Sequence, residues 1–235
     1  MDICSGLRKV VLMPKVTFVV PVYDGDVYLS ETLESIRNQS MKDIEIIVVD
    51  DASPDFTPEL MRWFLEKDPR IRYHRMETNG GVCEARNFGN KEAQSEIICV
   101  SDQDDISTPH RASFSYFYLM KHKDINCLTS AYWELNVDGE KQTQYFPEDM
   151  TLEYHQTEGS VWMHSSACYR KEDILKIPYR QVDGATDDWI FLDDWLAAGM
   201  KFKTTKHVLA NCRRLPWGVM NIMRSTKGMR PSYIL

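Results

Sequence analysis

Four short runs of apolar, largely β-branched residues alternate with three helical patterns in the first half of the chain. The runs occupy residues 16–22, 44–49, 71–74 and 97–100. The segments between them carry apolar residues at helical spacing, as at Leu29, Leu33 and Ile36. Strands that alternate with helices form βαβ units around a parallel sheet. We therefore predict an α/β fold with a Rossmann-like, mostly parallel sheet and helices on both faces.

Polar residues follow three of these runs at the point where each run ends. Tyr23 follows the first run, in which Pro21 is the last residue but one. Asp50 and Asp51 follow the second run, and residues 101–105 follow the fourth. Right-handed crossovers place the carboxyl ends of parallel strands at one edge of the sheet. Ligands of open α/β sheets bind outside that edge, so we expect the binding site there.

Three carboxylates within four residues stand out at this edge: Asp102, Asp104 and Asp105. Crowded carboxylates repel one another unless a cation joins them. Mg²⁺ and Mn²⁺ prefer carboxylate oxygen and commonly keep substrate phosphates as further ligands. A solvated acidic loop or a helix cap explains the same residues equally well. On these residues alone both interpretations stand.

The alternation of strands and helices stops after residue 105. We predict a helix over 109–122, strands over 127–137, 142–146 and 161–169, a helix over 186–198, and short strands over 201–203 and 208–210. Asp138-Gly139 is a hairpin turn signal. No linker interrupts the chain, so we predict one domain over 1–235. Its nucleotide-binding half covers about 14–110, and its smaller, mixed acceptor-side half covers 111–235. The second half ends in a basic tail formed by Arg213, Arg214, Arg224, Lys227 and Arg230.

Composition limits the partners and the compartment. The net charge of -7 argues against nucleic-acid binding, which needs a basic face. No run reaches the roughly 18 apolar residues of a transmembrane helix, although the basic tail allows peripheral contact with an anionic inner membrane face. The six cysteines form no Cys-x-x-Cys pair. We therefore expect free thiols, no structural zinc and a cytoplasmic location.

An ordered set of sequence blocks resembles the family-2 inverting glycosyltransferases of the GT-A fold. The blocks are FVVPVY (18–23), LESIRNQS (33–40), IIVVDDAS (46–53), NGGV (79–82), ARN (85–87) and SDQDD (101–105). They follow the family's order and spacing over roughly residues 16–110. A short acidic block, DDW (187–189), extends the similarity. Any single block is weak, but the ordered set is specific.

The resemblance implies a nucleotide-diphosphate sugar as donor, with a UDP-sugar favoured. Pro21, Tyr23 and Asp51 would hold the base and ribose, with Asp50 beside them. A carboxylate can accept from a base N–H or a ribose hydroxyl, and a tyrosine ring can stack on a base. The backbone N–H of Gly81 would approach a phosphate at the start of a helix, and Arg86 would reach the donor. A turn at 79–81 and a surface ion pair of Arg86 are the structural alternatives.

The resemblance also implies a divalent metal, Mg²⁺ or Mn²⁺. Asp102-Gln103-Asp104 corresponds to the family's Asp-x-Asp signature. Asp104 would be the direct ligand, Asp102 would contact ribose or a metal-bound water, and Asp105 would contribute third. The metal would neutralise charge on the leaving nucleoside diphosphate.

The resemblance assigns the catalytic site to the acidic pair Asp187-Asp188. The family usually has Glu-Asp here, so Asp187 departs from the pattern but keeps the charge. Asp188 would take a proton from the acceptor hydroxyl as its oxygen attacks the anomeric carbon, and one displacement inverts the configuration. Two acids in the first turn of a helix also offset its dipole, which is a structural explanation of the same pair.

The resemblance implies a carbohydrate or lipid-linked acceptor, in the synthesis of a cell-surface polysaccharide or glycoconjugate. Two other functions compete with this one. A sugar-nucleotide nucleotidyltransferase is expected to carry a glycine-rich loop with Arg or Lys after the first strand, whereas residues 23–26 include no basic residue. A non-catalytic protein of the same fold would bind the sugar nucleotide without transferring the sugar.

Overall fold

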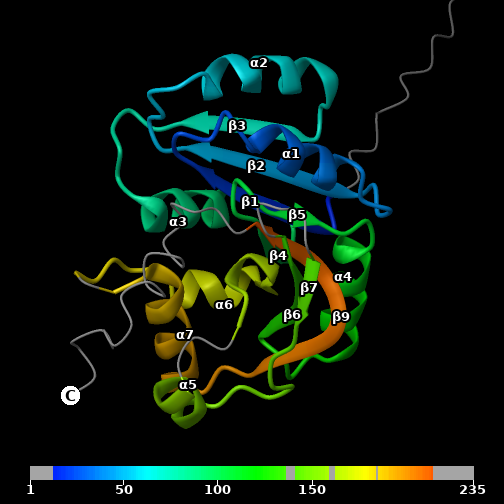
Figure 1. The fold of residues 1–235 in the computed structure, drawn as a ribbon, viewed down its shortest axis with the longest axis vertical. Helices are drawn as coiled ribbons and strands as arrows, with labels where there is room; N and C mark the ends of the chain where they lie inside the picture. The colour runs from blue at the N-terminus through cyan, green and yellow to red at the C-terminus, as the bar shows by residue number, and fades with distance from the viewer. Residues whose placement is uncertain (1–12, 136–140, 159–161, 184, 214–235) are drawn as a thin grey trace, which may run out of the picture.

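The computed structural model describes residues 13–135, 141–158, 162–183 and 185–213. Across these ranges nine strands form one sheet in the order β3-β2-β1-β4-β8-β6-β9-β5, with β7 paired to β6 (Figure 1). The first four run parallel to one another: β1 (Val16–Val22), β2 (Ile44–Asp50), β3 (Ile71–Arg75) and β4 (Ile97–Val100). Their carboxyl ends therefore share one edge, as predicted from the alternation of strands and helices.

The remaining strands extend the sheet with mixed pairing. They are β5 (Ile106–Ser107), β6 (Cys127–Leu135), β7 (Lys141–Gln144), β8 (Cys168–Arg170) and β9 (Phe202–Arg213). β8 runs antiparallel to both β4 and β6, whereas β9 is parallel to β6. The continuous strand β9 replaces the two short strands predicted there, and its register on β6 shifts at two points. β8 is shorter than predicted because residues 164–166 form a 3₁₀ turn. The turn predicted at Asp138-Gly139 lies outside the described residues.

Helices cover both faces of the sheet, as predicted (Figure 1). One face carries α1 (Leu29–Arg37), α2 (Thr57–Lys67) and α4 (Arg111–Lys121). The other carries α3 (Val82–Glu92), α6 (Lys171–Lys176) and α7 (Asp187–Ala197), and α5 (Leu152–Glu158) packs on α7. Side chains alternate along β1, so that Phe18 and Val20 pack into the first layer and Val19 into the second. In the described ranges, none of the helices is both long and apolar enough to cross a bilayer.

Asp55 stabilises the start of α2, in which Thr57 is the first helical residue and makes no side-chain cap. The Asp55 carboxylate instead accepts hydrogen bonds from the Thr57 N–H at 3.1 Å, the Thr57 hydroxyl at 3.0 Å and the Asp26 N–H at 2.8 Å. Burial opposes ionisation of Asp55, but these hydrogen bonds outweigh it and lower the pKa of the carboxyl. The loops that follow β1 and β2 are thereby joined at the carboxyl edge of the parallel strands.

Two cysteines depart from the expectation of free thiols. Cys99 on β4 lies directly opposite Cys168 on β8, and the two form a disulfide. The pair is separated by 69 residues in the sequence and meets only because β8 pairs with β4. Cys83, Cys127 and Cys212 remain thiols.

Candidate active site

Asp50, at the end of β2, is completely buried, and its carboxylate contacts nearby protein groups. Its carboxylate accepts hydrogen bonds from the Ser53 N–H at 2.7 Å and from the Tyr73 hydroxyl, and Arg75 lies 3.5 Å away. These contacts fix a sharp turn in which Ala52 has a φ of 61°. Asp50 therefore shapes the loop beside the site, and its oxygens are directed at protein groups.

Asp51 and Gly81, both predicted nucleotide contacts, contact each other. The two oxygens of the Asp51 carboxylate accept hydrogen bonds from the N–H groups of Gly80 at 2.7 Å and Gly81 at 2.8 Å. Gly81 has a φ of 89°, which favours glycine, and α3 begins at the next residue. The carboxylate thus holds the entrance to α3 against the end of β2.

Gln103 connects the end of β1 to the acidic cluster, a role that the sequence analysis did not assign. Its side-chain oxygen accepts from the Tyr23 N–H at 2.8 Å, and its amide donates to the Tyr23 carbonyl at 3.0 Å. Tyr23 is 48% exposed, whereas Pro21 is buried within β1. An amide offers a donor and an acceptor side by side, which matches the two backbone groups of one residue.

The three carboxylates after β4 differ in burial and in their partners. Asp105 is buried, and its oxygens accept from the Ser165 hydroxyl and, at 3.0 Å, from the Arg213 N–H. Asp102 keeps 34% of its side chain exposed, and Asp104 is half-buried. No group of three His, Cys, Asp or Glu side chains in the described ranges is arranged to hold a metal ion by itself.

Burial and mutual repulsion oppose ionisation within the cluster. Burial and the charge of Asp102 raise the pKa of Asp104 to about 6. Burial and the charges of Asp104 and Asp102 raise the pKa of Asp105 to about 8. A carboxyl that is reluctant to ionise in a buried acidic cluster fits a position that a cation occupies during function.

Arg111 provides a buried cation near the acids and was missed by the sequence analysis. Its guanidinium donates to the carbonyls of Val100 and Ala167 and to the Ser107 hydroxyl, and it lies 5.5 Å from the Phe18 ring centre. Burial lowers the pKa of Arg111 to about 10, against the opposing effect of the acids. In the sequence it is an ordinary residue at the start of a helix.

Arg86 brings the two acidic regions together. Its guanidinium donates to Asp102 at 2.8 Å and forms an ion pair with Asp187 at the start of α7. The arginine is only 5% exposed, and its charged group lies 5.4 Å from the centre of the Tyr179 ring. The carboxyl end of β4 and the amino end of α7 therefore meet through a single residue of α3.

Asp188 is oriented differently from its neighbour Asp187. It accepts the Trp189 N–H at 2.9 Å and lies on the same helical face as Leu192 and Trp195, four and seven residues later. Both of those side chains are completely buried, so this face of α7 points into the protein. Asp188 remains half-buried at the end of that face. The acidic pair is thus divided between an ion pair and a half-buried carboxylate that bonds its own helix.

Arg213, at the end of β9, is already held by protein groups. It forms an ion pair with Glu31 at 2.7 Å, donates to the Asp104 carbonyl at 3.2 Å and lies over the Tyr28 ring at 4.5 Å. Arg214 and the remainder of the basic tail lie outside the described residues.

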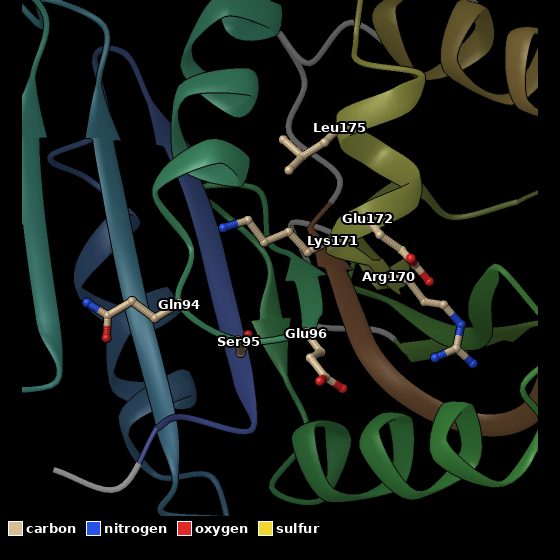
Figure 2. Close-up of a pocket in the computed structure, with 7 residues that line it drawn as sticks. All are labelled: Gln94, Ser95, Glu96, Arg170, Lys171, Glu172 and Leu175. Atoms are coloured by element: carbon tan, nitrogen blue, oxygen red, sulfur yellow. The ribbon is translucent and has the colours of Figure 1, made fainter.

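A cavity of about 480 Å³ lies at the other end of β4, away from the acidic cluster (Figure 2). It is lined by Gln94, Ser95, Glu96, Arg170, Lys171, Glu172 and Leu175. Ser95 and Glu96 precede β4, whereas the acidic cluster follows it. None of the predicted site residues lines this cavity.

Curated relatives of the chain are glycosyltransferases. Glycosyltransferase GlyG of Streptococcus pneumoniae is 34% identical over 131 residues, which cover 56% of this chain and 42% of the relative. An uncharacterised glycosyltransferase of Methanocaldococcus jannaschii is 27% identical over 205 residues, which cover 85% of this chain and 71% of the relative. An uncharacterised glycosyltransferase of Haemophilus influenzae is 38% identical over 93 residues, and the match spans 37% of its length. The chain thus aligns with less than half of the S. pneumoniae and H. influenzae relatives.

Solved structures share the fold. TarS (residues 1–349) of S. aureus in complex with UDP-GlcNAc superposes with a TM-score of 0.71 at 21% identity, covering 86% of this chain and 59% of that one. A mannosyltransferase of Pyrobaculum calidifontis with GDP-Man and Mn²⁺ gives 0.66 at 19% identity, covering 87% and 57%. These similarities identify the GT-A glycosyltransferase fold. The sequence profile of glycosyl transferase family 2 matches residues 17–197, more than half of the chain, and the chain therefore belongs to that family.

Proposed function

We propose that the protein transfers a sugar from a nucleotide-diphosphate donor to an acceptor hydroxyl, with inversion at the anomeric carbon. The contact of Arg86 with both Asp102 and Asp187 carries this proposal. It places the acids expected to hold the donor and the helix expected to supply the base against one buried cation. A UDP-sugar is the favoured donor, and Tyr23 and Asp51 would contact its nucleoside.

Mg²⁺ or Mn²⁺ fits the acidic cluster when the donor diphosphate supplies further ligands. Metals of this class commonly bind one or two carboxylates together with substrate phosphates. Asp104 and Asp102 are the ligands that we propose, and Asp105 supports them from its buried position. When bound, the metal would neutralise charge on the leaving nucleoside diphosphate.

Asp188 acts as the general base in this proposal. It accepts the proton of the acceptor hydroxyl while the acceptor oxygen bonds to the anomeric carbon. The bond from that carbon to the diphosphate oxygen breaks on the opposite side, which inverts the configuration. Asp187 serves a different purpose, because its ion pair with Arg86 fixes the first turn of α7.

The acceptor that we propose is a carbohydrate or a lipid-linked saccharide, in the synthesis of a cell-surface polysaccharide or glycoconjugate. A Bacillus subtilis relative that is 28% identical over 163 residues is a minor teichoic acid biosynthesis protein. The reaction would take place in the cytoplasm, with the basic tail in peripheral contact with the inner membrane face.

Donor binding is tested by thermal shift with UDP, GDP and other nucleoside diphosphates, each with and without Mn²⁺. We expect the melting temperature to rise when the correct nucleotide and the metal are both present. Ligand at one hundred times its Kd adds about 2.7 kcal/mol to the free energy of unfolding. A panel without any metal-dependent shift would contradict the donor-site proposal.

The reaction is tested with the Asp188→Asn variant. It should keep the metal-dependent nucleotide shift and lose transfer by about 10²- to 10⁴-fold. NMR of the product should show an inverted anomeric configuration. Transfer by Asp188→Asn at the wild-type rate would show that Asp188 is not the general base. Release of pyrophosphate from a nucleoside triphosphate and a sugar phosphate would identify a nucleotidyltransferase. Binding of a donor without turnover of any donor would identify a non-catalytic protein.

A further inference from the structure

The segment that precedes α7 is fastened along that helix. We call residues 177–180 the α6–α7 strap. The Ile177 carbonyl accepts the indole N–H of Trp195 at 2.9 Å, and the Tyr179 ring stacks on Phe191 with centres 4.5 Å apart and planes at 19°. Displacement of the strap would therefore displace α7 with it.

The strap is also fastened to α3, by the Asn87 side chain. The amide of Asn87 donates to the Tyr179 carbonyl at 2.8 Å, and its oxygen accepts the Tyr179 N–H at 3.0 Å. One short side chain thus satisfies both backbone groups of a single residue in a loop, as a paired strand would. Asn87 follows Arg86 directly, so the residue that joins the acidic regions and the residue that grips the strap are adjacent on α3.

Tyr179 continues the connection to Phe191, which lies three residues after Asp188. Residues three apart share a helical face, so the contact with Phe191 sets how the face that carries Asp188 is turned. The Tyr179 ring also lies next to the Arg86 guanidinium, and its hydroxyl is 2.7 Å from the His164 ring. The side chain is buried and held on three sides.

We propose that Asn87 is a positioning residue that sets the placement of Asp188 relative to the donor. The inference rests on the proposed transferase function. α3 carries Arg86 to the donor-side acids, and Asn87 transmits the position of α3 through the strap to α7. A general base must lie within hydrogen-bond reach of the hydroxyl it deprotonates, and an error of about 1 Å in such a placement can cost about 10²-fold in rate.

The Asn87→Ala variant tests this role by separating turnover from donor binding. We expect kcat to fall about 10- to 100-fold, whereas the donor KM and the nucleotide–Mn²⁺ thermal shift stay within about twofold. An unchanged kcat would overturn the proposal. A parallel loss of nucleotide affinity would also overturn it, because Asn87 would then support the donor site itself.

Gln39 provides a matched control. It is buried, and its amide also joins a neighbouring segment through backbone groups: it donates to the Thr108 carbonyl at 2.7 Å and accepts the Ala112 N–H at 2.9 Å, at the start of α4. Gln39→Ala should lower the melting temperature and leave kcat within about threefold. If Asn87→Ala proves too unstable to assay, Asn87→Asp keeps the acceptor and loses the donor, and we expect the same fall in kcat. A wild-type kcat in Asn87→Asp would overturn the proposal.

A double-mutant cycle shows whether Asn87 acts through Asp188. Single-turnover rates are measured for wild type, Asn87→Ala, Asp188→Asn and the double variant. Once the base is absent, its placement no longer matters, so Asn87→Ala should reduce the residual rate less than about threefold. Losses that multiply would overturn the positioning role. Full activity of Asp188→Asn alone would instead refute the base, so the two failures are distinguishable.

Discussion

At the scale of single residues, the acids of the candidate site differ in the hydrogen-bond donors that their carboxylate oxygens contact. Asp50, Asp51 and Asp105 each accept hydrogen bonds from protein N–H or hydroxyl groups on both oxygens. Asp104 and Asp188 lack such a set within the described ranges. The sequence marks the whole acidic group but cannot show how each carboxylate is turned, because that depends on partners far along the chain.

Asp68, away from the site, illustrates the opposite kind of carboxylate and gives a pH-dependent prediction. Burial opposes its ionisation, but Arg70 and Arg37 outweigh it and lower the pKa of Asp68 to about 2. A lowered pKa contributes stability above the unfolded value, and that stability is lost as the pH falls through the folded value. Asp68→Asn should cost about 1–2 kcal/mol of unfolding free energy at pH 7. The difference from wild type should shrink as the pH falls from 4 towards 2.

Denaturant unfolding across this pH range checks the Asp68 prediction. Asp43→Asn is the control, because Asp43 pairs with Lys15 at 3.3 Å with both side chains more than 40% exposed. An exposed pair of this kind contributes at most about 1 kcal/mol. An Asp68→Asn deficit that stays constant down to pH 2 would show that packing, and not charge, explains the loss.

At the scale of elements, α3 organises the site through three nearby residues. Arg86 reaches the acids, Asn87 reaches the strap, and Gly89 packs on the sheet. The helix steps by roughly 100° per residue, so neighbouring residues face different parts of the protein. The block 85–87 was recognisable in the sequence, but only the packing of α3 shows that its members have different partners.

Gly89 allows α3 to approach β1 closely. A Cβ added there would lie 2.5 Å from Cγ1 of Val19 and 3.3 Å from Cγ2 of Val49. Gly→Ala at an exposed helical position gains about 1 kcal/mol, but here we expect Gly89→Ala to lower the unfolding free energy by about 1–3 kcal/mol through overpacking. Chemical denaturation measures both its size and its sign.

Val19→Ala provides the rescue for this prediction. It removes the nearest methyl groups, so the double variant should be more stable than the sum of the two single effects predicts. Simple additivity, or a stabilising Gly89→Ala, would mean that α3 does not press on β1 at this point.

At the scale of the whole molecule, the acidic cluster is where distant parts of the sheet meet. Asp105 binds the N–H of Arg213, which lies 108 residues away, and the hydroxyl of Ser165. Arg111 joins the carbonyls of Val100 on β4 and Ala167 before β8. Strand β4 and the second half of the chain are thus held together beside the acidic cluster.

Arg111→Met should therefore affect stability and donor binding together. The substitution removes the guanidinium donor from the Val100 and Ala167 carbonyls, and a buried polar group left without its partner costs about 1–3 kcal/mol of unfolding free energy. The loss of the cation also leaves Asp105 and Asp102 less compensated, so the nucleotide–Mn²⁺ affinity should change as well. Denaturation and isothermal titration measure the two effects.

Arg111→Lys separates charge from geometry in this prediction. Lysine keeps the positive charge but cannot reproduce the fork of a guanidinium. We expect it to preserve nucleotide–Mn²⁺ binding better than Arg111→Met while it still loses stability. Unaltered stability in both variants would contradict the role given to Arg111.

The sequence by itself determined the βαβ half of the fold and the location of the candidate site. Helical and strand periodicities are local, so the buried faces of α1 and of the first four strands could be predicted from spacing alone. The acidic residues at strand ends followed from the rule that parallel strands share one ligand-binding edge. The resemblance to the family rested on blocks in that same half, and the family match confirms it.

The tertiary structure alone decided how those residues are used. The helices α5 and α6 and the strand β5 are too short to leave a clear period, and β9 is one long strand only because β6 lies beside it. The Cys99–Cys168 pair, Arg111 beneath the acids and the bond from Asn87 to Tyr179 all join residues distant in sequence. Such contacts depend on chain reversals and packing that no local pattern encodes, and they separate an acid that supports the site from one that faces it.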